Sequence, residues 1–306
     1  MKVLFLGSSH FSKVVLQSML QQKVEVVAVI TAPDKEVGRG HKLQANEVKI
    51  FACQNGIEVF CSSSVKNDIE KIKQIAFDVS VVASFGQILP KEFLDYRLCL
   101  NVHPSALPKY RGASPIQNAI LNGDRQTAVT IMKVGQKVDS GDIALQQKVE
   151  ILPHEMYNAL EEKLAQIGGV MIGQALNLLE KDRLQFTPQN EKEATYVKKF
   201  NKEDGLLDFS QTSEKIFNQV RALSENLGTY FYLKEHKIKV FEVKPTDEKI
   251  TINQIANDKN HFLIGCKNGA IEILSCLSPS GKKLSGKDFL NGFKPQGEFV
   301  NEFCRS

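Results

Sequence analysis

Hydrophobic residues in the first part of the chain fall into short continuous runs separated by helically spaced sets. Lys2 to Leu6 is an apolar run that stops at a glycine turn, helical spacing follows from Phe11 to Leu20, and Val24 to Ile30 is a second apolar run. Continuous apolar strands are typical of a parallel sheet that is covered on both faces. This order predicts a βαβ unit at the start of an α/β fold.

The same alternation continues to about residue 180. It predicts helices over Asn46–Gln54, Val65–Ile75, Lys91–Tyr96, Ala113–Leu121 and Met156–Leu179. It predicts strands over Ile57–Phe60, Asp78–Ala83, Thr127–Val134 and Gln146–Ile151. The segment Thr31–Leu43 has one proline, two glycines and mixed charges, so we expect an exposed loop there. The N-terminal domain, residues 1–186, is therefore predicted to have a Rossmann-like, mostly parallel sheet.

The pattern changes after Phe186. Residues 187–206 are polar and basic, which favours a linker. One helix is predicted over Ser213–Leu223, and after it come short alternating strands at Thr229–Leu233, Lys237–Val243, His261–Cys266 and Ala270–Leu277. This spacing favours a smaller, OB-like β-barrel as a C-terminal domain over residues 207–306.

Composition restricts the classes of protein to which the chain can belong. The 306 residues carry a net charge of only +4, which permits a nucleic-acid partner without requiring one. The six cysteines show no C-x-x-C spacing, which argues against a structural metal and for reduced thiols. The first apolar run is too short for a signal peptide, and no run approaches the roughly 18 apolar residues of a membrane span. We expect a soluble, cytoplasmic enzyme without a metal and without a membrane contact.

The candidate chemistry lies around three polar residues. Asn101 and His103 stand two apart at the end of a β-prone run, so a strand would point both side chains to one face. Asp139 follows the strand predicted over Thr127–Val134. An amide donor, an imidazole and a carboxylate together can stabilise an oxyanion and move protons at a tetrahedral carbon. Asn101, His103 and a carboxylate of the segment Asp139-Ser140-Gly141-Asp142 are therefore the candidate catalytic residues.

The surrounding motifs identify a family. The run from Asn101 to Gly112, with Asp139-Ser140-Gly141-Asp142 after it, resembles the formyltetrahydrofolate-dependent formyltransferase family. The resemblance covers nearly the whole chain and includes Gly38-Arg39-Gly40, Phe85-Gly86, Ile88-Leu89-Pro90, Ala194-Thr195-Tyr196 and Gly281-Lys282-Lys283. It implies 10-formyltetrahydrofolate as co-substrate. The loop around Arg39 and the second domain imply initiator methionyl-tRNA as the formyl acceptor.

The resemblance also implies a role for each site residue. Asn101 would donate a hydrogen bond to the oxyanion, His103 would add charge and protonate the folate nitrogen, and Asp139 would take the proton of the attacking amine. The folate would be bordered by Ser105, Ala106, Leu107, Pro108, Gln87, Ile88 and Leu89. The tRNA would be contacted by Arg39 and Lys42. We expect the enzyme to be a monomer.

The sequence leaves three alternatives open. The chain could be a sister formyltransferase that acts on an amino sugar or a nucleotide amine. It could be a non-catalytic RNA-binding module on a Rossmann-like scaffold, or a thiol enzyme that uses Cys99, which shares its strand face with Asn101 and His103. The chain departs from the family pattern at Ala106, at Gly135–Val138 and at Ser224–Gly228, and it contains no tryptophan.

Overall fold

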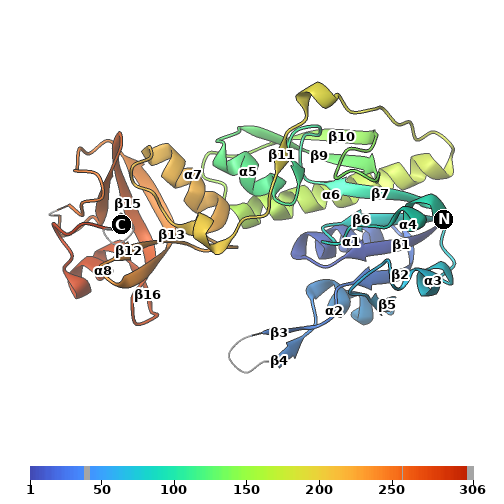
Figure 1. Ribbon diagram of the computed structural model, residues 1–306, viewed down its shortest axis with the longest axis horizontal. Coiled ribbons are helices and arrows are strands. Elements are labelled where there is room, and N and C mark those ends of the chain that lie inside the picture. The colour runs from blue at the N-terminus through green and yellow to red at the C-terminus, as the bar shows by residue number, and fades with distance from the viewer. Residues whose placement is uncertain (38–41, 257, 302–306) are drawn as a thin grey trace. The chain divides into compact units, whose positions relative to one another are not determined.

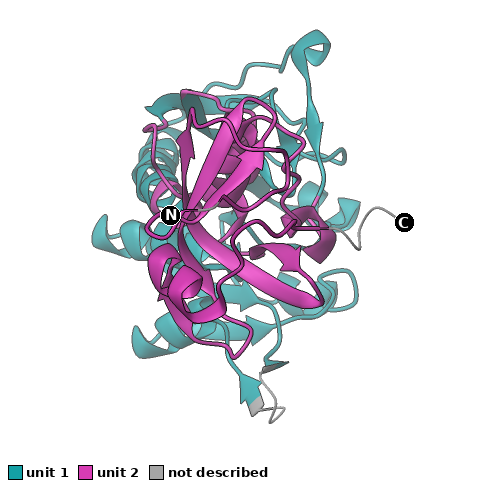
Figure 2. Cartoon of the chain, turned by 90° about the vertical axis from the view of Figure 1, so that its left-hand side faces the viewer, with its two compact units in different colours: residues 1–115, 126–150, 161–198 teal, residues 116–125, 151–160, 199–306 magenta. Residues whose placement is uncertain are grey.

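The computed structural model describes residues 1–37, 42–256 and 258–301 (Figure 1). The chain forms two compact units, coloured separately in Figure 2. Unit 1 comprises residues 1–115, 126–150 and 161–198, and unit 2 comprises residues 116–125, 151–160 and 199–306. No helix among the described residues is both long enough and apolar enough to cross a membrane.

Unit 1 is built on a seven-stranded sheet with the strand order β10-β9-β7-β6-β1-β2-β5. Strands β5, β2, β1, β6 and β7 run parallel, and β9 and β10 are antiparallel to their neighbours. This arrangement confirms the predicted Rossmann-like, mostly parallel sheet. The bounds are β1 Lys2–Gly7, β2 Glu25–Thr31, β5 Glu58–Cys61, β6 Val79–Ala83, β7 Leu98–His103, β9 Gln126–Lys133 and β10 Ile143–Glu150.

The helices of the chain's first part follow the predicted order. They are α1 His10–Gln21, α2 Glu47–Gln54, α3 Ile69–Lys73, α4 Lys91–Tyr96, α5 Pro115–Leu121 and α6 Tyr157–Glu180. The unit 1 part of α6 packs closely on β7, because a Cβ atom added at Gly168 would lie 2.5 Å from Cγ1 of Val102. Only glycine permits this approach. Since Val102 stands between Asn101 and His103, the contact holds the strand that carries two predicted catalytic residues.

Two predictions in this part were wrong. The segment Thr31–Leu43 contains strands β3 (Lys35–Val37) and β4 (Lys42–Gln44), which pair antiparallel. These strands are short and largely polar, so they lack the apolar alternation by which strands are recognised. The helix expected over Val65–Ile75 shrinks to α3, because residues 64–68 form a turn in which the amides of Asn67 and Asp68 donate to the Ser64 carbonyl.

Unit 2 contains α7, Ser213–Leu223, and a five-stranded sheet with the order β12-β13-β15-β14 and with β16 on β15. Its elements after α7 are β12 Thr229–Leu233, β13 His236–Thr246, β14 Leu263–Cys266, β15 Gly269–Leu277, β16 Lys283–Ser285 and α8 Gly286–Phe293. The bridges Leu233↔Val300, Gln254↔Phe299 and Ile255↔Ile264 connect its two edges through residues 252–255 and 299–300. The sheet thus closes on itself, as predicted for a barrel.

The sequence prediction missed the last two elements of unit 2, β16 and α8. Strand β16 has only three residues, and α8 includes two glycines, Gly286 and Gly292, which weaken the helical signal. Phe289 and Leu290 of α8 are buried in the barrel core, so tertiary packing stabilises a helix that propensity alone would not select.

The segment expected to be a linker has structure of its own. It contains the 3-10 helices η1 (Glu191–Glu193) and η2 (Lys202–Gly205) and strand β11 (Tyr196–Val197). Strand β11 pairs in parallel with β8, Arg111–Gly112, and unit 1 extends to residue 198. The first half of this segment is therefore part of the compact body that holds the predicted catalytic residues. The predicted domain boundaries at residues 186 and 206 stay predictions.

An imidazole joins three helices of unit 1. His10 Nδ1 lies 2.9 Å from Glu47 Oε2 on α2, and its Nε2 lies 2.9 Å from Glu162 Oε2 on α6. Lys13 also donates to Glu47, at 3.4 Å. The hydrogen bonds to Glu47 and then to Glu162 raise the pKa of His10, and the bond to His10 lowers the pKa of Glu47. The protonated His10 side chain thus links α1 to both α2 and α6.

This link between the helices predicts that the stability of the protein depends on pH. Because the pKa of His10 is raised by folding, its contribution is complete below the unfolded pKa of about 6.5 and is lost as pH rises through the folded pKa. Since Glu47 has a lowered pKa, its contribution is lost only as pH falls through that lowered value. We expect His10→Gln to lower the melting temperature by about 2 °C near pH 6 and by nearly nothing near pH 9.

The control for this experiment is His154→Gln, because His154 is exposed and has no carboxylate partner among the contacts described. Thermal melts of both variants and the wild type at the two pH values give the comparison. An equal destabilisation by His10→Gln at pH 6 and pH 9 contradicts the assigned role of the charged imidazole.

Candidate active site

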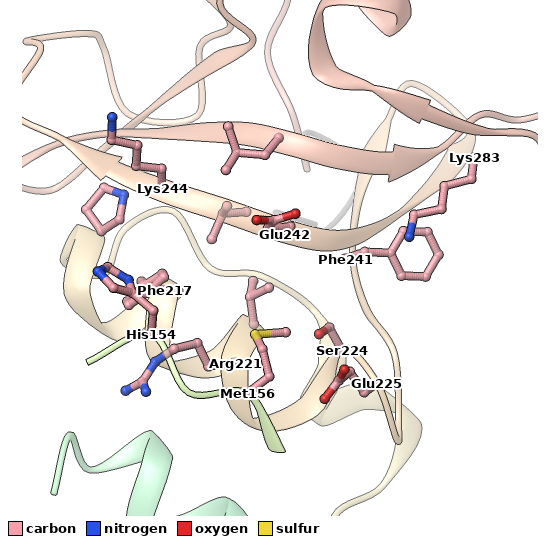
Figure 3. A pocket seen from close by; sticks show the side chains of 14 residues that line it. His154, Met156, Phe217, Arg221, Ser224, Glu225, Phe241, Glu242, Lys244 and Lys283 are labelled. Carbon is pink, nitrogen blue, oxygen red and sulfur yellow. The ribbon is translucent and has the colours of Figure 1, made fainter. Parts of the chain in front are cut away.

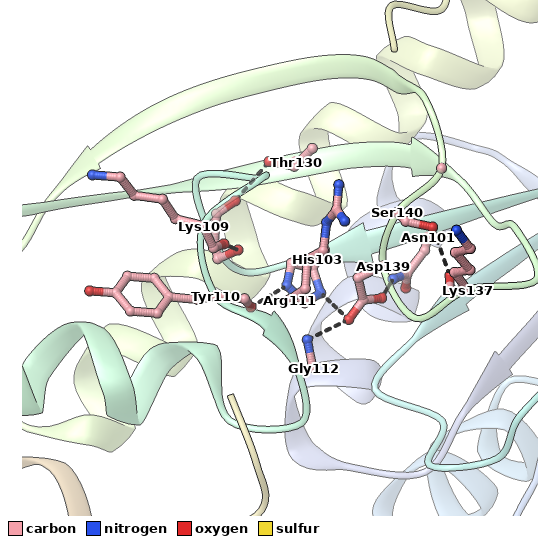
Figure 4. A network of polar contacts seen from close by, with 12 residues as sticks. Asn101, His103, Lys109, Tyr110, Arg111, Gly112, Thr130, Lys137, Asp139 and Ser140 are labelled. Carbon is pink, nitrogen blue, oxygen red and sulfur yellow. Dashed lines mark hydrogen bonds and ion pairs between the residues drawn. The ribbon is translucent and has the colours of Figure 1, made fainter. Parts of the chain in front are cut away.

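The three predicted catalytic residues meet in unit 1 (Figure 4). Asn101 and His103 lie at the carboxyl end of β7, and the loop between β9 and β10 brings back Asp139. Asn101 Nδ2 donates to Asp139 Oδ1 at 3.4 Å, and His103 Nδ1 lies 3.6 Å from Asp139 Oδ2. An amide, an imidazole and a carboxylate that are 38 and 36 positions apart in the chain are therefore within contact distance.

The Asp139 carboxylate has a third partner. The backbone amide of Gly112 donates to Asp139 Oδ2 at 2.9 Å. Gly112 has φ +118°, and a Cβ atom there would lie 2.2 Å from the carbonyl oxygen of Val197. A larger residue would therefore disturb both the β8–β11 pairing and the amide that holds the carboxylate. Asp139 itself has φ +47°, a left-handed conformation that needs support from its surroundings.

His103 is almost completely enclosed. Only 4% of the residue is exposed, and its Nε2 lies 3.2 Å from the carbonyl oxygen of Tyr110. With Nδ1 directed toward Asp139, both ring nitrogens face oxygen acceptors. These surroundings orient the ring, and they suit an imidazole that acts as a hydrogen-bond donor.

The predicted folate residues after β7 divide into two kinds. Ser105 and Leu107 are buried, and the Ser105 hydroxyl donates to the Lys109 carbonyl at 2.7 Å. The Ser105 carbonyl accepts from Thr130 Oγ1 at 2.7 Å. Ala106 and Pro108 are half-buried. Ser105 and Leu107 thus shape the loop, whereas Ala106 and Pro108 are the members of this set with accessible surface.

The predicted folate residues after β6 also differ in how accessible their side chains are. Gln87 Oε1 accepts from the Val65 amide at 3.0 Å, and Gln87 Nε2 donates to the Ser62 carbonyl at 2.8 Å, so this side chain braces a neighbouring turn. Leu89 is buried, whereas Ile88 is 86% exposed. The loop leaves β6 beside Asn101, since Val82 pairs with Asn101 across the β6–β7 ladder. Ile88 is accordingly the residue of this set with accessible apolar surface.

Of the two predicted tRNA residues, Lys42 alone belongs to the part of the chain that the structure describes. Arg39 lies outside the described residues. Lys42 is the first residue of β4, where it pairs with Val37. Among the described residues, no group of three or more His, Cys, Asp and Glu side chains is arranged to hold a metal ion.

Sequence reasoning missed the role of Arg111. Its side chain is fully buried, and its guanidinium group donates to both carboxylate oxygens of Glu191, at 2.7 and 3.0 Å, and to the Tyr196 hydroxyl at 2.9 Å. It also donates twice to Gln189 Oε1, at 2.9 and 3.0 Å. The hydrogen bond to Glu191 is the main reason that the pKa of Arg111 is raised, and Arg111 in turn lowers the pKa of Glu191.

A signal for this cluster was present in the sequence. Gln189, Glu191 and Tyr196 are polar residues close together in a segment that follows a long helix, and Arg111 belongs to the motif that runs on from His103. No local pattern joins residues 78 to 85 positions apart, however. The cluster becomes evident only once β11 is seen beside β8.

Unit 2 has a cavity of about 500 Å³ between α7 and β13 (Figure 3). Apolar side chains that include Met156, Phe217 and Leu274 line it together with Arg221. The guanidinium of Arg221 donates to Asn218 Oδ1 at 2.7 Å and to the carbonyls of Leu152 and Glu155 at 3.4 and 3.1 Å. None of the predicted site residues lines this cavity, so it adds nothing to the candidate active site.

Comparison with known proteins now identifies the family. Residues 1–176 match the model of the formyl transferase domain, and residues 199–294 match the model of the formyl transferase C-terminal domain. The chain belongs to the formyl transferase family. It is 35% identical to a methionyl-tRNA formyltransferase of Sulfurihydrogenibium sp., with 96% of this chain and 97% of that one covered. It is 36% identical to the methionyl-tRNA formyltransferase of Carboxydothermus hydrogenoformans, with 96% and 97% covered.

Solved structures support the fold of this formyltransferase. WlaRD, a sugar 3N-formyl transferase, superposes with a TM-score of 0.67 at 21% identity and covers 93% of this chain and 98% of its own. HypX from Aquifex aeolicus, solved with tetrahydrofolic acid, superposes with a TM-score of 0.67 at 18% identity, covering 97% of this chain and 48% of its own. The shared architecture agrees with the α/β unit and the β-rich unit described above.

Proposed function

We propose that this formyltransferase transfers the formyl group of 10-formyltetrahydrofolate to the α-amino group of methionine on initiator tRNA. The observation that carries the proposal is the contact of Asn101, His103 and Asp139 in unit 1. Relatives named methionyl-tRNA formyltransferase match over 96% of the chain, which supports the choice of acceptor. The proposed setting is translation initiation in the cytoplasm, by a monomer.

The chemistry requires one bond to form and one to break at the formyl carbon. The methionine amine attacks this carbon, its carbonyl oxygen gains negative charge, and the bond to the folate nitrogen then breaks. The amine loses one proton, and the folate nitrogen gains one. A donor for the oxygen, an acid for the leaving nitrogen and an acceptor for the amine's proton are therefore needed.

The site residues suit these three tasks. Asn101 Nδ2 is an amide donor for the developing oxyanion, and the enclosed His103 imidazole is the acid that delivers a proton to the folate nitrogen. The Asp139 carboxylate, 3.6 Å from His103, accepts the proton of the amine. The same carboxylate orients the amide and the imidazole, because it contacts both.

The residues that remain accessible fit a folate. Ile88, which is 86% exposed, offers apolar surface to a flat pterin, beside the partly accessible Ala106 and Pro108. Gln87, which we expected to border the folate, uses its side-chain amide on the turn at Ser62–Val65 instead. We therefore assign the folate contacts to Ile88, Ala106 and Pro108. The other predicted residues, which are Gln87, Leu89, Ser105 and Leu107, would support them.

The tRNA side of the proposal is supported by the charges of unit 2. Strand β13 exposes Lys237, Lys239 and Lys244 in alternation with buried apolar residues. Glu242 is also exposed on this strand, so three cations outnumber one anion there. This excess of positive charge suits contact with phosphate groups, and binding through it weakens as salt concentration rises. Arg39 and Lys42 of the hairpin segment are the proposed contacts to the acceptor end of the tRNA.

The deciding assay compares three acceptors. The purified chain is supplied with 10-formyltetrahydrofolate and with initiator methionyl-tRNA, elongator methionyl-tRNA or dTDP-3-aminofucose, an amino sugar bound by a structurally similar N-formyltransferase. We expect formyl transfer to initiator methionyl-tRNA and little to the other two. Transfer to the amino sugar alone would end the tRNA assignment and favour the sister formyltransferase.

The thiol alternative has its own test. Cys99 is 2% exposed, and burial raises the pKa of its thiol to about 12, which disfavours the reactive thiolate at neutral pH. We expect Cys99→Ala to keep kcat for formyl transfer within about twofold while lowering the melting temperature, because a core methyl-sized group is lost. A folded Cys99→Ala protein that has lost its activity would revive the thiol mechanism.

A further inference from the structure

We propose that Gln189 is a positioning residue for the Asp139 carboxylate, and that buried Arg111 holds Gln189 in place for this purpose. The inference rests on the proposed function, in which Asp139 accepts a proton. It concerns a residue of the segment between the two matched family domains, since residues 177–198 lie outside both.

Both polar atoms of the Gln189 side-chain amide make two hydrogen bonds each. Its Nε2 donates to the carbonyl oxygen of Asp139 at 2.9 Å and to that of Gly141 at 2.7 Å. Its Oε1 accepts from Arg111 Nε at 3.0 Å and from Arg111 Nη2 at 2.9 Å. One amide therefore joins the backbone of the Asp139 loop to a guanidinium group with no exposed surface.

Arg111 is itself fixed from the other side. Its remaining donors are paired with Glu191 and the Tyr196 hydroxyl, and its backbone amide donates to the Thr195 carbonyl at 2.8 Å. The next residue, Gly112, supplies the amide that binds Asp139 Oδ2. Arg111 thus reaches Asp139 by two routes, through Gly112 to the carboxylate and through Gln189 to the backbone.

The Asp139 loop needs such a support. Asp139 has φ +47°, a conformation that costs free energy in a residue with a side chain, and its neighbours Gln136, Lys137 and Val138 are exposed. The two hydrogen bonds from Gln189 hold the carbonyls on both sides of Ser140. If they are lost, the loop can relax, and a displacement of about 1 Å at a catalytic group can cost on the order of a hundredfold in rate.

Gln189→Glu isolates the donor role. The glutamate keeps two oxygens that accept from Arg111, so the guanidinium stays paired, but it has no N–H for the carbonyls of Asp139 and Gly141. Gln147→Glu, at an exposed position of β10, is the matched control for the added charge. Gln189→Met, which is similar in length and uncharged, serves if the glutamate variant does not fold.

Two readouts separate positioning from general stability. In steady-state formylation of initiator methionyl-tRNA, we expect Gln189→Glu to lower kcat by about tenfold to a hundredfold with KM for both substrates within about threefold. In amide hydrogen exchange followed by NMR, we expect the Gly112 amide, which binds Asp139, to exchange faster. The adjacent Arg111 amide, bound to Thr195, should exchange at the wild-type rate.

The result that overturns the inference is an unchanged kcat, or an acceleration of exchange that is equal at Gly112 and Arg111 and so reflects overall loosening. The exchange measurement needs no substrate. If the wild-type chain fails to formylate initiator methionyl-tRNA, the proposed function is wrong, and the exchange rates still decide whether Gln189 positions Asp139.

Discussion

His103→Gln is expected to lower kcat for formylation of initiator methionyl-tRNA by a factor of about 10² to 10⁴, because the variant lacks the acid that we propose for protonation of the folate nitrogen. Glutamine keeps a polar side chain of similar reach in a site that is 4% exposed, so folding should be preserved. Single-turnover formylation gives the rate, and the dissociation constant for the tRNA should stay within about threefold.

His261→Gln is the control, because His261 is an exposed histidine of unit 2 whose partner is Glu272 and not a residue of the site. It should leave kcat unchanged. A His103→Gln enzyme that keeps wild-type kcat would show that His103 is not the acid. A wild-type chain that binds the tRNA but transfers no formyl group would favour the RNA-binding module without catalysis.

Asp139→Asn is expected to lower kcat about a thousandfold. The carboxylate accepts from the Gly112 amide at Oδ2 and from Asn101 Nδ2 at Oδ1. An amide group can present only one oxygen, so in the variant either Gly112 or Asn101 faces another N–H group. The change therefore removes the proposed proton acceptor and also disturbs Asn101, the proposed oxyanion donor.

The comparison variant is Asp142→Asn, which neutralises another carboxylate of the same loop. We expect it to keep kcat within about threefold, since the hydrogen bonds and ion pairs described for His103 and Asn101 do not involve its side chain. Similar losses in both variants would point to the net charge of the loop and away from the specific contacts of Asp139.

Most elements of unit 1 could be predicted because their physical cause is local. The runs at Lys2–Leu6 and Val24–Ile30 are apolar on both faces, as strands in a covered parallel sheet require. The hairpin β3–β4 and helix α8 lacked such a signal, because the former is polar and the latter is stabilised by burial of Phe289 and Leu290. Intrinsic helix or strand propensity is a weak predictor of an element that is stabilised mainly by tertiary packing.

Some residues of the candidate site could likewise be predicted from local sequence, and others could not. The alternation of a strand already places Asn101 and His103 on one face, and a recognised motif supplied Asp139. The supports of Asp139 could not be predicted, because Gln189 lies 50 residues further along the chain and reaches Asp139 only through the fold. Gln87 was assigned to folate on resemblance, and this stays a prediction; its hydrogen bonds to the turn at Ser62–Val65 could not be foreseen, because they join residues 22 and 25 positions apart.

Unit 2 is made of separate stretches of the chain, which matters for the design of chimeric proteins. Residues 151–160 belong to it, and the carbonyls of Leu152 and Glu155 accept hydrogen bonds from the buried Arg221 guanidinium. A chimera that imports only the stretch after residue 199 from another family member would pair that cation with a foreign peptide segment. Grafting is expected to work best when the short piece and the C-terminal stretch come from the same donor, so the recombination unit is discontinuous in the gene.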